Sequence, residues 1–267
     1  MSGTERCRKE LGKHEIVHQL QDLGVQPGGV LLVHASFRAV RPIEGGPHGL
    51  IDALQTALGP EGTLVMPSWT ADSDKPFDPE TSPTDPDLGV TASLFWQRPE
   101  VVRSEHCFAF AACGPRAAEI VSGPLPLPPH IPQSPVGHVH DHNGQVLMLG
   151  VNHDANTTIH LAEIMADVPY RIPYHVTILQ NGRPMRIDYG ENDHCCQRFN
   201  LVGGWLREHG LQREGPVGNA HARLIRSRDV VDVVRERLRD DPLLFLHPED
   251  AGCAECDEAR RSVSLTP

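Results

Sequence analysis

The chain has 267 residues and a formal net charge of −11, because 35 aspartates and glutamates outnumber 24 lysines and arginines. This acidity disfavours a general nucleic-acid binder, which needs a basic surface to displace counterions. The negative charge either attracts cationic ligands or only keeps the protein soluble. No segment approaches the roughly 18 apolar residues of a membrane helix, and the charged first residues lack the apolar part of a secretory signal. We therefore expect neither a nucleic-acid partner nor a membrane partner.

The first part of the chain predicts a parallel βαβ unit. Short apolar runs at 30–33 and 62–66 are typical of buried strands, and apolar residues at helical spacing predict helices over 8–24 and 49–58. The order of strand, helix and strand favours a right-handed crossover. Residues 67–89 are rich in proline and aspartate and form a long loop, which in proteins is usually functional or disordered.

The remainder of the chain continues the alternation of strands and helices. A third apolar strand at 146–151 precedes a helix at 157–165, which Asn156 or Thr157 caps at its N-terminus. Asn181-Gly182 is the signal of a β-hairpin with a type I′ turn. The other expected elements are strands at 108–112, 175–179 and 185–189, a Pro-rich irregular segment at 123–135, and helices at 91–98, 115–121, 197–209, 218–226 and 228–238.

The chain shows no internal repeat and no linker. We therefore expect one α/β domain over residues 1–267, with a mixed central β-sheet flanked by helices and a C-terminal Cys-x-x-Cys tail at about 250–260. Seven cysteines, an odd number in a chain large enough to fold without disulfides, indicate a reducing compartment and a cytoplasmic protein. Nothing in the sequence decides between a monomer and a homodimer.

Two short segments suggest a phosphate-bearing ligand. Ligands of open α/β sheets bind beyond the carboxyl ends of strands, where Ser36 and Arg38 follow the first predicted strand. Arg103 and Ser104 pair a guanidinium, which binds phosphate oxygens bidentately, with a hydroxyl. The alternatives are a helix cap for the serine and a solvated or rim-paired side chain for the arginine.

A histidine one turn into the 157–165 helix is a candidate general base. His160 is held on a rigid element that follows a strand, and its carboxylate partner is expected to be Glu191, just after the hairpin. A carboxylate on one imidazole nitrogen fixes the tautomer and raises the basicity of the other nitrogen. The alternative is a histidine satisfied within the core.

Several long blocks carry a resemblance to a known family. They are GGVLLVHASFRAVRP at 28–42, GPEGTLVMPSW at 59–69, DPDLGV at 85–90, RSEHCFAFAACGP at 103–115, SPVGHVH at 134–140, LGVNHDANTTIHLAE at 149–163, YGENDHCC at 189–196 and EGPVG at 214–218. In these blocks the chain resembles the aminoglycoside 3-N-acetyltransferases of the antibiotic N-acetyltransferase family, above all the type IV enzymes of apramycin and gentamicin resistance. Cys107 departs from the pattern, since many relatives carry proline there.

The resemblance implies an acyltransferase that moves acetyl from acetyl-CoA to the 3-amino group of the 2-deoxystreptamine ring of aminoglycosides. It implies His160 as the general base, Glu191 as its acidic partner, and a fold other than that of the common acetyltransferase superfamily, whose [RQ]xxGx[GA] signature is absent. We expect direct transfer in a ternary complex, without an acyl-enzyme. By the same resemblance the coenzyme ligands are His34, Ser36, Phe37, Arg38, Arg103 and Ser104.

A polycationic substrate gives the acidic composition a reason. Besides Glu191, the side chains expected to contact the ammonium groups of the substrate are Asp72, Asp74, Asp154, Asn156 and Asp193. The alternative for the first two is turn capping. Thr157 or Thr158 is expected to stabilise the oxyanion of the tetrahedral intermediate.

The cysteines of the C-terminal half suggest a structural zinc site. Cys253 and Cys256 form a Cys-x-x-Cys pair, and Cys195 and Cys196 supply a second pair, with His194 as a substitute for one of the latter. Free thiols are the alternative.

Two further alternatives remain open. His138, His140 and His142 alternate along the chain, so on a strand they would share one face and could form a metallohydrolase centre. The other interpretation of this segment is a polar hairpin around Asn143-Gly144. The second alternative function is a zinc-stabilised interaction module that catalyses no reaction.

Overall fold

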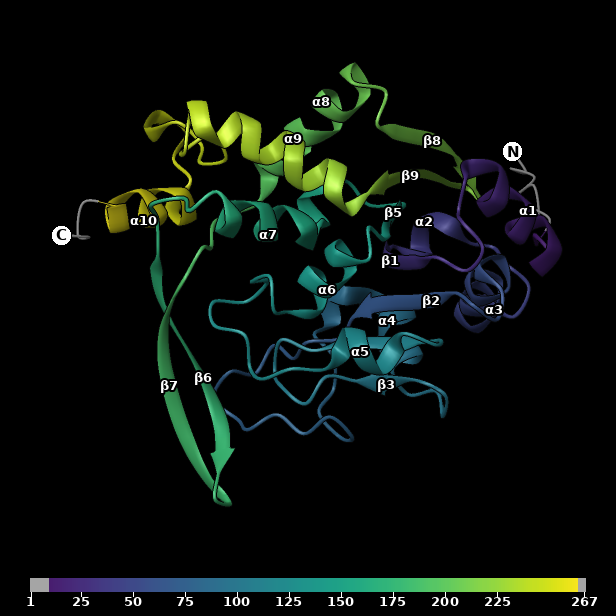
Figure 1. Ribbon diagram of the computed structural model, residues 1–267, viewed down its shortest axis with the longest axis horizontal. Coiled ribbons are helices and arrows are strands. Elements are labelled where there is room, and N and C mark those ends of the chain that lie inside the picture. Colours follow the sequence, from purple (N-terminus) through teal and green to yellow (C-terminus); the bar gives the residue numbers. More distant parts are fainter. Residues whose placement is uncertain (1–9, 264–267) are drawn as a thin grey trace, which may run out of the picture.

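The computed structural model describes residues 10–263 and contains a seven-stranded sheet in the order β3-β4-β2-β1-β5-β9-β8 (Figure 1). The central strands β2, β1 and β5 are parallel, and the other neighbours are antiparallel. Their bounds are β1 Val30–Ala35, β2 Thr63–Pro67, β3 Val102–Arg103, β4 Phe110–Cys113, β5 Gln145–Leu149, β8 Gln212–Val217 and β9 Ala220–Arg226. The expected mixed sheet of an α/β fold is confirmed.

Both faces of the sheet are covered, because the central strands are apolar throughout. In β1, Val30 and Leu32 belong to one hydrophobic cluster, while Leu31 and Val33 belong to the other. The second cluster is covered by α1 Lys13–Leu23, α3 Gly46–Leu58 and α4 Gly89–Phe95. The first is covered by α5 Ala117–Val121, α6 Pro135–Asp141, α7 Thr157–Met165, α8 Val202–Glu208, α9 Ser227–Asp240 and α10 Ala254–Val263.

A two-stranded hairpin projects away from the main sheet (Figure 1). Strands β6 Ile172–Gln180 and β7 Arg183–Glu191 join through Asn181 and Gly182, which both have positive φ, 53° and 74°. This is the geometry of the expected type I′ turn. The backbone N–H of Thr177 in β6 donates to the carbonyl of Ser73, so the hairpin lies against the long Asp-rich loop. The middle of β6 thus lies beside this loop.

The structure corrects two sequence-based expectations. Residues 218–226 are not a helix but the strand β9, in which Ala220, Ala222 and Leu224 are buried. The histidines at 138–142 lie on and after the helix α6, whose cap residue Ser134 accepts from the N–H of Gly137. His138 bonds the carbonyl of Ile120, and within residues 10–263 the three histidines form no metal cluster.

Within the described range, no helix combines the length and apolar character needed to span a bilayer.

Candidate active site

The site lies beyond the carboxyl ends of β1 and β5, where the connections leave on opposite sides of the sheet. The loop after β5 passes close to the loop after β1, and Gly150 makes this possible. A Cβ at Gly150 (φ 71°) would stand 2.5 Å from the Cβ of Ala39. Asn156 then caps α7 by accepting from the N–H of Thr158 at 3.1 Å. The start of α7 is therefore fixed beside the strand ends.

A buried carboxylate organises the histidines of α7 and its surroundings. The Nδ1 of His160 donates to Oε2 of Glu163 at 2.9 Å, and the Nε2 of His194 donates to Oε1 of Glu163 at 2.9 Å. The hydroxyl of Tyr170 also donates to Oε1. Burial would raise the pKa of Glu163, but His194 and His160 lower it to about 2. Glu163 therefore stays ionised and fixes the orientation of His160 through Nδ1.

The partner of His160 is thus Glu163, and not Glu191 as the sequence predicts. Glu163 lies three residues after His160, so the two side chains share one face of α7. Burial alone would lower the pKa of His160, but the anionic forms of Cys196 and Glu163 raise it well above its usual value.

Two rings and a thiol complete the surroundings of His160. His130 stacks on it with a centroid separation of 5.3 Å and an interplanar angle of 16°. Phe199 packs edge-on at 4.9 Å. The Sγ of Cys196 lies 3.5 Å from Nε2. The Nε2 of His130 is buried and has no hydrogen-bond partner among residues 10–263.

A cavity of about 280 Å³ with an acidic lining adjoins this histidine pair. His130 belongs to its wall, together with the carboxylates of Asp85, Glu191 and Asp193 and the ring of Tyr174. Burial and the neighbouring Asp193 raise the pKa of Glu191 to about 7, against the opposing hydrogen bond from Tyr189 and the charge of His160. Glu191 and Asp193 therefore line the same cavity, whose acidic wall suits a cation.

The other expected substrate ligands do not line this cavity. Asp72 pairs with Lys75 at 2.7 Å and Asp74 with His175 at 2.8 Å, both on the loop that faces the hairpin. Asp154 is exposed in the turn before α7. Asn156 is buried and its side chain caps α7.

The carboxyl end of β1 borders a second cavity, of about 310 Å³. His34 lines it and bonds Oγ1 of Thr157 at 3.2 Å, and burial lowers the pKa of His34 to about 3, so its ring is neutral. Ser36 begins the short helix α2 Phe37–Val40, in which Arg38 is exposed. Arg38 has no ion pair or hydrogen bond with the described residues. The two cavities share Trp69 and Asp85, so they are neighbours.

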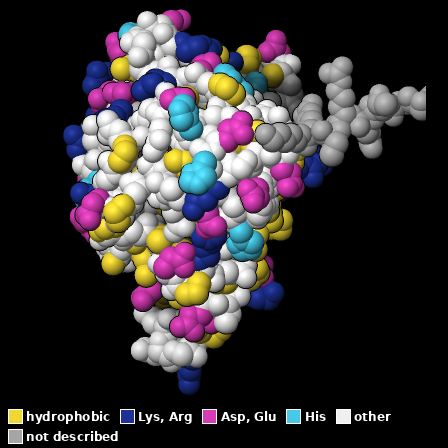
Figure 2. Space-filling view, turned by 90° about the vertical axis from the view of Figure 1, so that its right-hand side faces the viewer, with side chains coloured by type: hydrophobic (Ala, Val, Ile, Leu, Met, Phe, Trp, Pro, Cys, Tyr) yellow, Lys and Arg dark blue, Asp and Glu magenta, His cyan; other side chains and the backbone are white. Residues whose placement is uncertain are grey.

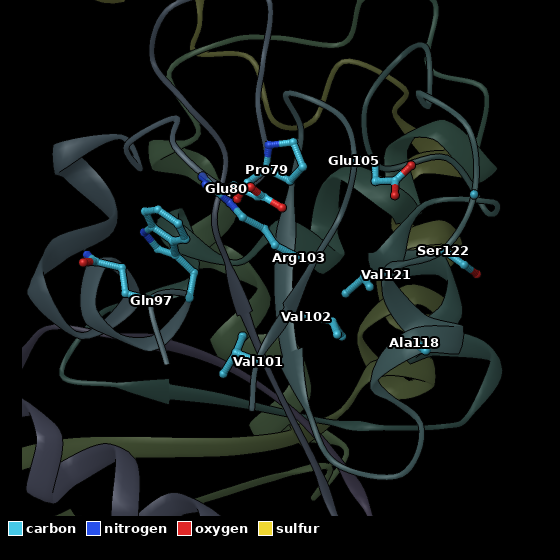
Figure 3. A pocket seen from close by; sticks show the side chains of 12 residues that line it. Pro79, Glu80, Gln97, Val101, Val102, Arg103, Glu105, Ala118, Val121 and Ser122 are labelled. Carbon is cyan, nitrogen blue, oxygen red and sulfur yellow. Dashed lines mark hydrogen bonds between the residues drawn. The ribbon is translucent and has the colours of Figure 1, made fainter. Parts of the chain in front are cut away.

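Arg103 and Ser104, which the sequence predicts as coenzyme ligands, both bond to the backbone of neighbouring segments. The guanidinium of Arg103 donates to the carbonyls of Ser68 and Ser82, at 2.6 Å each, and lies over the ring of Trp96 at 4.2 Å. Ser104 is buried and bonds the backbone of Phe110. Arg103 ties the long loop to β3, beside a surface cavity of about 680 Å³ that Figure 3 shows around it.

A cluster of four potential metal ligands lies near the C-terminus. The ligand atoms of Cys195, His247, Cys253 and Cys256 all lie within 4.8 Å of one another. Cys196 is not among them, because its sulfur faces His160, and His194 is bound to Glu163. The expected set of four cysteines is therefore corrected to three cysteines and His247.

Sequence reasoning missed four residues of these two sites, and only one left a readable signal. Glu163 stands at helical i,i+3 spacing from His160, which predicts proximity. His130 lies in the Pro-rich segment, Tyr170 in the turn after α7, and His247 in the connection after α9, where no spacing predicts a partner.

Charged side chains of both signs are mixed on the face of the molecule in Figure 2. Figure 2 shows one face, on which acidic side chains are interspersed with lysines and arginines and do not gather into one patch. On this face, the net charge of −11 produces no general surface for cations. The carboxylates that could select a cation lie in the cavity of Glu191.

Comparisons with known proteins agree on a single family. The model of the aminoglycoside 3-N-acetyltransferase family matches residues 32–239. The chain is 64% identical to aminoglycoside N(3)-acetyltransferase IV of a Salmonella species, over 91% of this chain and 93% of that protein. It is 30% identical to enzyme IX of Micromonospora chalcea, over 79% and 88%.

Solved structures give the same result. The apoenzyme of AAC(3)-IVa superposes with a TM-score of 0.95 at 63% identity, over 97% of this chain and all of that one. A histidine-to-alanine variant of that protein was solved with a gentamicin bound. AAC-VIa with bound sisomicin superposes with a TM-score of 0.80 at 28% identity, over 87% and 99%. The chain therefore belongs to the aminoglycoside 3-N-acetyltransferase family of acyltransferases.

Proposed function

We propose that this enzyme transfers the acetyl group of acetyl-CoA to the 3-amino group of the 2-deoxystreptamine ring of aminoglycosides such as apramycin and gentamicin, and so confers resistance. Family membership supports the reaction class. The observation that carries the proposal for this chain is the His160–Glu163 pair, which stands beside a cavity lined by Glu191 and Asp193. A base next to carboxylates is what acylation of a polycationic amine requires.

His160 removes the proton that the attacking amine must lose. Glu163 fixes Nδ1–H, so Nε2 accepts this proton while the nitrogen attacks the thioester carbonyl and the coenzyme thiolate leaves. A bound polycation opposes the upward pKa shift of His160, because it adds positive charge near the ring. Transfer is direct, in a ternary complex.

Thr157 is the oxyanion donor that fits this geometry. It lies one turn before His160 on the same face of α7, and its hydroxyl contacts His34. Thr158, the other candidate, has no exposed surface and cannot reach the substrate.

In this proposal acetyl-CoA binds in the second cavity. Its wall includes His34 and the carboxyl ends of β1 and β2, where open α/β sheets bind ligands. The exposed Arg38 follows β1 closely and is free to contact the phosphates of the coenzyme.

The cysteines of the described residues are all unpaired, which supports a reducing cytoplasm as the location.

A coenzyme A release assay tests the proposal. Purified enzyme with acetyl-CoA and apramycin or gentamicin is expected to release coenzyme A, with NMR of the product placing the acetyl group on the 3-amino nitrogen. The reaction without aminoglycoside is the control. Equal release in that control, or acetylation of a different amine, would contradict the proposal.

The pKa of Glu191 predicts how substrate capture depends on pH. Below about pH 7 the carboxyl is protonated and neutral, and above it the anion attracts the ammonium groups of the substrate. We expect kcat/KM for apramycin to rise as pH passes upward through this range. Glu191→Gln should flatten part of the rise and raise KM about fivefold, the effect of a contact of roughly 1 kcal/mol. Asp188→Asn, an exposed acid on the same strand, is the matched control and should keep the wild-type profile.

We also propose a structural zinc ion at Cys195, His247, Cys253 and Cys256. Sulfur and nitrogen ligands of tetrahedral zinc stand roughly 3.5–3.8 Å apart, given bonds of about 2.3 and 2.0–2.1 Å. The Sγ of Cys195 lies 3.3 Å from Nδ1 of His247 and 3.6 Å from Sγ of Cys256. The donor set thus fits the ion, which would fasten α10 to the segment after the hairpin.

Metal analysis of purified protein is expected to find one zinc ion per chain. Cys253→Ser with Cys256→Ser should remove it and lower Tm by on the order of 5 °C, a loss of about 2 kcal/mol for a domain of this size. Cys113→Ser, which is outside the cluster, should keep both the metal and the Tm. Zinc should also survive Cys196→Ser and be lost in His247→Ala; the reverse pattern would refute this ligand set.

A further inference from the structure

Cys195 and Cys196 are neighbours in the chain but face different sites. The sulfur of Cys195 belongs to the proposed zinc cluster, whereas the sulfur of Cys196 lies 3.5 Å from Nε2 of His160. Because Nδ1 of His160 is occupied by Glu163, Nε2 is the nitrogen that must work as the base. The thiol of Cys196 therefore stands beside the one atom of His160 that the reaction needs.

The local backbone holds this thiol in place. Cys196 has φ 56° and ψ −3°, a left-handed conformation that costs a non-glycine residue about 1–3 kcal/mol. Its N–H donates to Nδ1 of His194 at 3.1 Å, and its thiol donates to the carbonyl of His194 at 3.2 Å. His194 is in turn bonded to Glu163, so the thiol, the base and the carboxylate form one connected unit.

Cys196, His160 and Glu163 have the arrangement of a nucleophile, a base and a group that orients the base. Cys196 is partly buried, as are Cys113, Cys195 and Cys253, so the contact with Nε2 of His160 is what distinguishes it. We propose that Cys196 is a covalent modification site for small soft electrophiles and activated disulfides, and that a group attached there blocks Nε2 of His160. The activity readout of this inference rests on the proposed function, but the modification itself does not.

The reaction with a methanethiosulfonate illustrates the chemistry. The sulfur of Cys196 attacks the sulfenyl sulfur of the reagent as the thiol proton is released. The S–S bond to methanesulfinate breaks as a new S–S bond to Cys196 forms, and the sulfinate leaves with the electron pair. Since an S–S bond is about 2.05 Å long and Nε2 is only 3.5 Å from Sγ, the added group occupies the approach to the base.

The test treats zinc-loaded enzyme with methyl methanethiosulfonate and follows peptide mass, zinc content and acetyl transfer together. We expect one thiomethyl group at Cys196, retained zinc, and a loss of activity of about 10²-fold or more, the contribution of a general base. Dithiothreitol should restore activity. Apramycin should slow the labelling, because it fills the space in front of His160.

Variants separate this site from the other cysteines. Cys196→Ser and Cys196→Ala should resist inactivation, each measured against its own untreated rate, while Cys113→Ser should be inactivated like the wild type. Inactivation of the Cys196 variants at the wild-type rate would overturn the proposal, as would full activity with Cys196 labelled. Labelling of Cys196 in an enzyme that acetylates nothing would refute the proposed function and leave the modification site standing.

Discussion

Replacing His160 with alanine is expected to lower kcat by about 10²- to 10⁴-fold, the usual contribution of a positioned general base. The acidic cavity is lined by Glu191 and Asp193, and His160 is not part of that lining, so the affinity for apramycin should stay near the wild-type value. Steady-state kinetics of coenzyme A release gives kcat, and calorimetric titration with apramycin gives the affinity.

A partly buried histidine outside both cavities provides the comparison for this variant. His142 pairs with Glu119 at 3.1 Å. It precedes α7 in the chain and lines neither cavity. His142→Ala should retain the wild-type kcat. If His160→Ala kept most of its activity, the role of His160 as the base would be wrong.

Glu163→Gln is the second change with a large expected effect. The amide cannot accept hydrogen bonds on both sides as the carboxylate does, so its NH₂ group opposes the donor of either His160 or His194. The imidazole then loses its fixed tautomer. We expect a loss of up to about 10⁴-fold in kcat with little change in KM, as for the orienting carboxylate of a serine protease.

Stability distinguishes the two possible roles of this carboxylate. Glu163→Ala removes a fully buried charge that Tyr170 also contacts, and should cost about 3–5 kcal/mol in the free energy of unfolding. Glu163→Gln keeps the volume and should cost less, so its kinetic defect reports on catalysis. Glu119→Gln, at an exposed glutamate, should change neither quantity. A Glu163→Gln enzyme with wild-type kcat would show that the carboxylate serves the fold alone.

The sequence is most informative where local chemistry decides the structure. Apolar runs in the three parallel strands and the pair Asn181-Gly182 are sufficient to predict the sheet centre and the hairpin. The prediction of a helix in place of β9 is wrong, although Gly218-Asn219 joins Val217 to Ala220 as a second two-residue hairpin loop. The edge strand β8 and its neighbour β9 carry charged residues and lack the apolar run that identifies a buried strand.

Residues of the candidate site can be predicted only when their own segment positions them. His160 follows from its place at the start of a helix after a strand. The sequence predicts its partner across the chain at Glu191, although Glu163 lies one turn away on the same helix. His247 enters the cysteine cluster from the connection after α9, and no sequence spacing predicts a contact that tertiary packing alone creates.

The vicinal cysteines connect the two centres of the molecule. Cys195 belongs to the proposed zinc cluster and Cys196 contacts His160, so one short turn joins the metal site to the base. Loss of the ion would free this turn. The zinc is therefore expected to support the position of His194 and Cys196 as well as the C-terminal helix.

Non-additivity of two variants tests the central claim, that Glu163 works through His160, most directly. The kcat of the double variant His160→Ala, Glu163→Gln should equal that of His160→Ala alone, because a positioning carboxylate has nothing to position once the imidazole is gone. A double-variant kcat reduced by the product of the two single losses would show that the two residues act independently and would contradict the account.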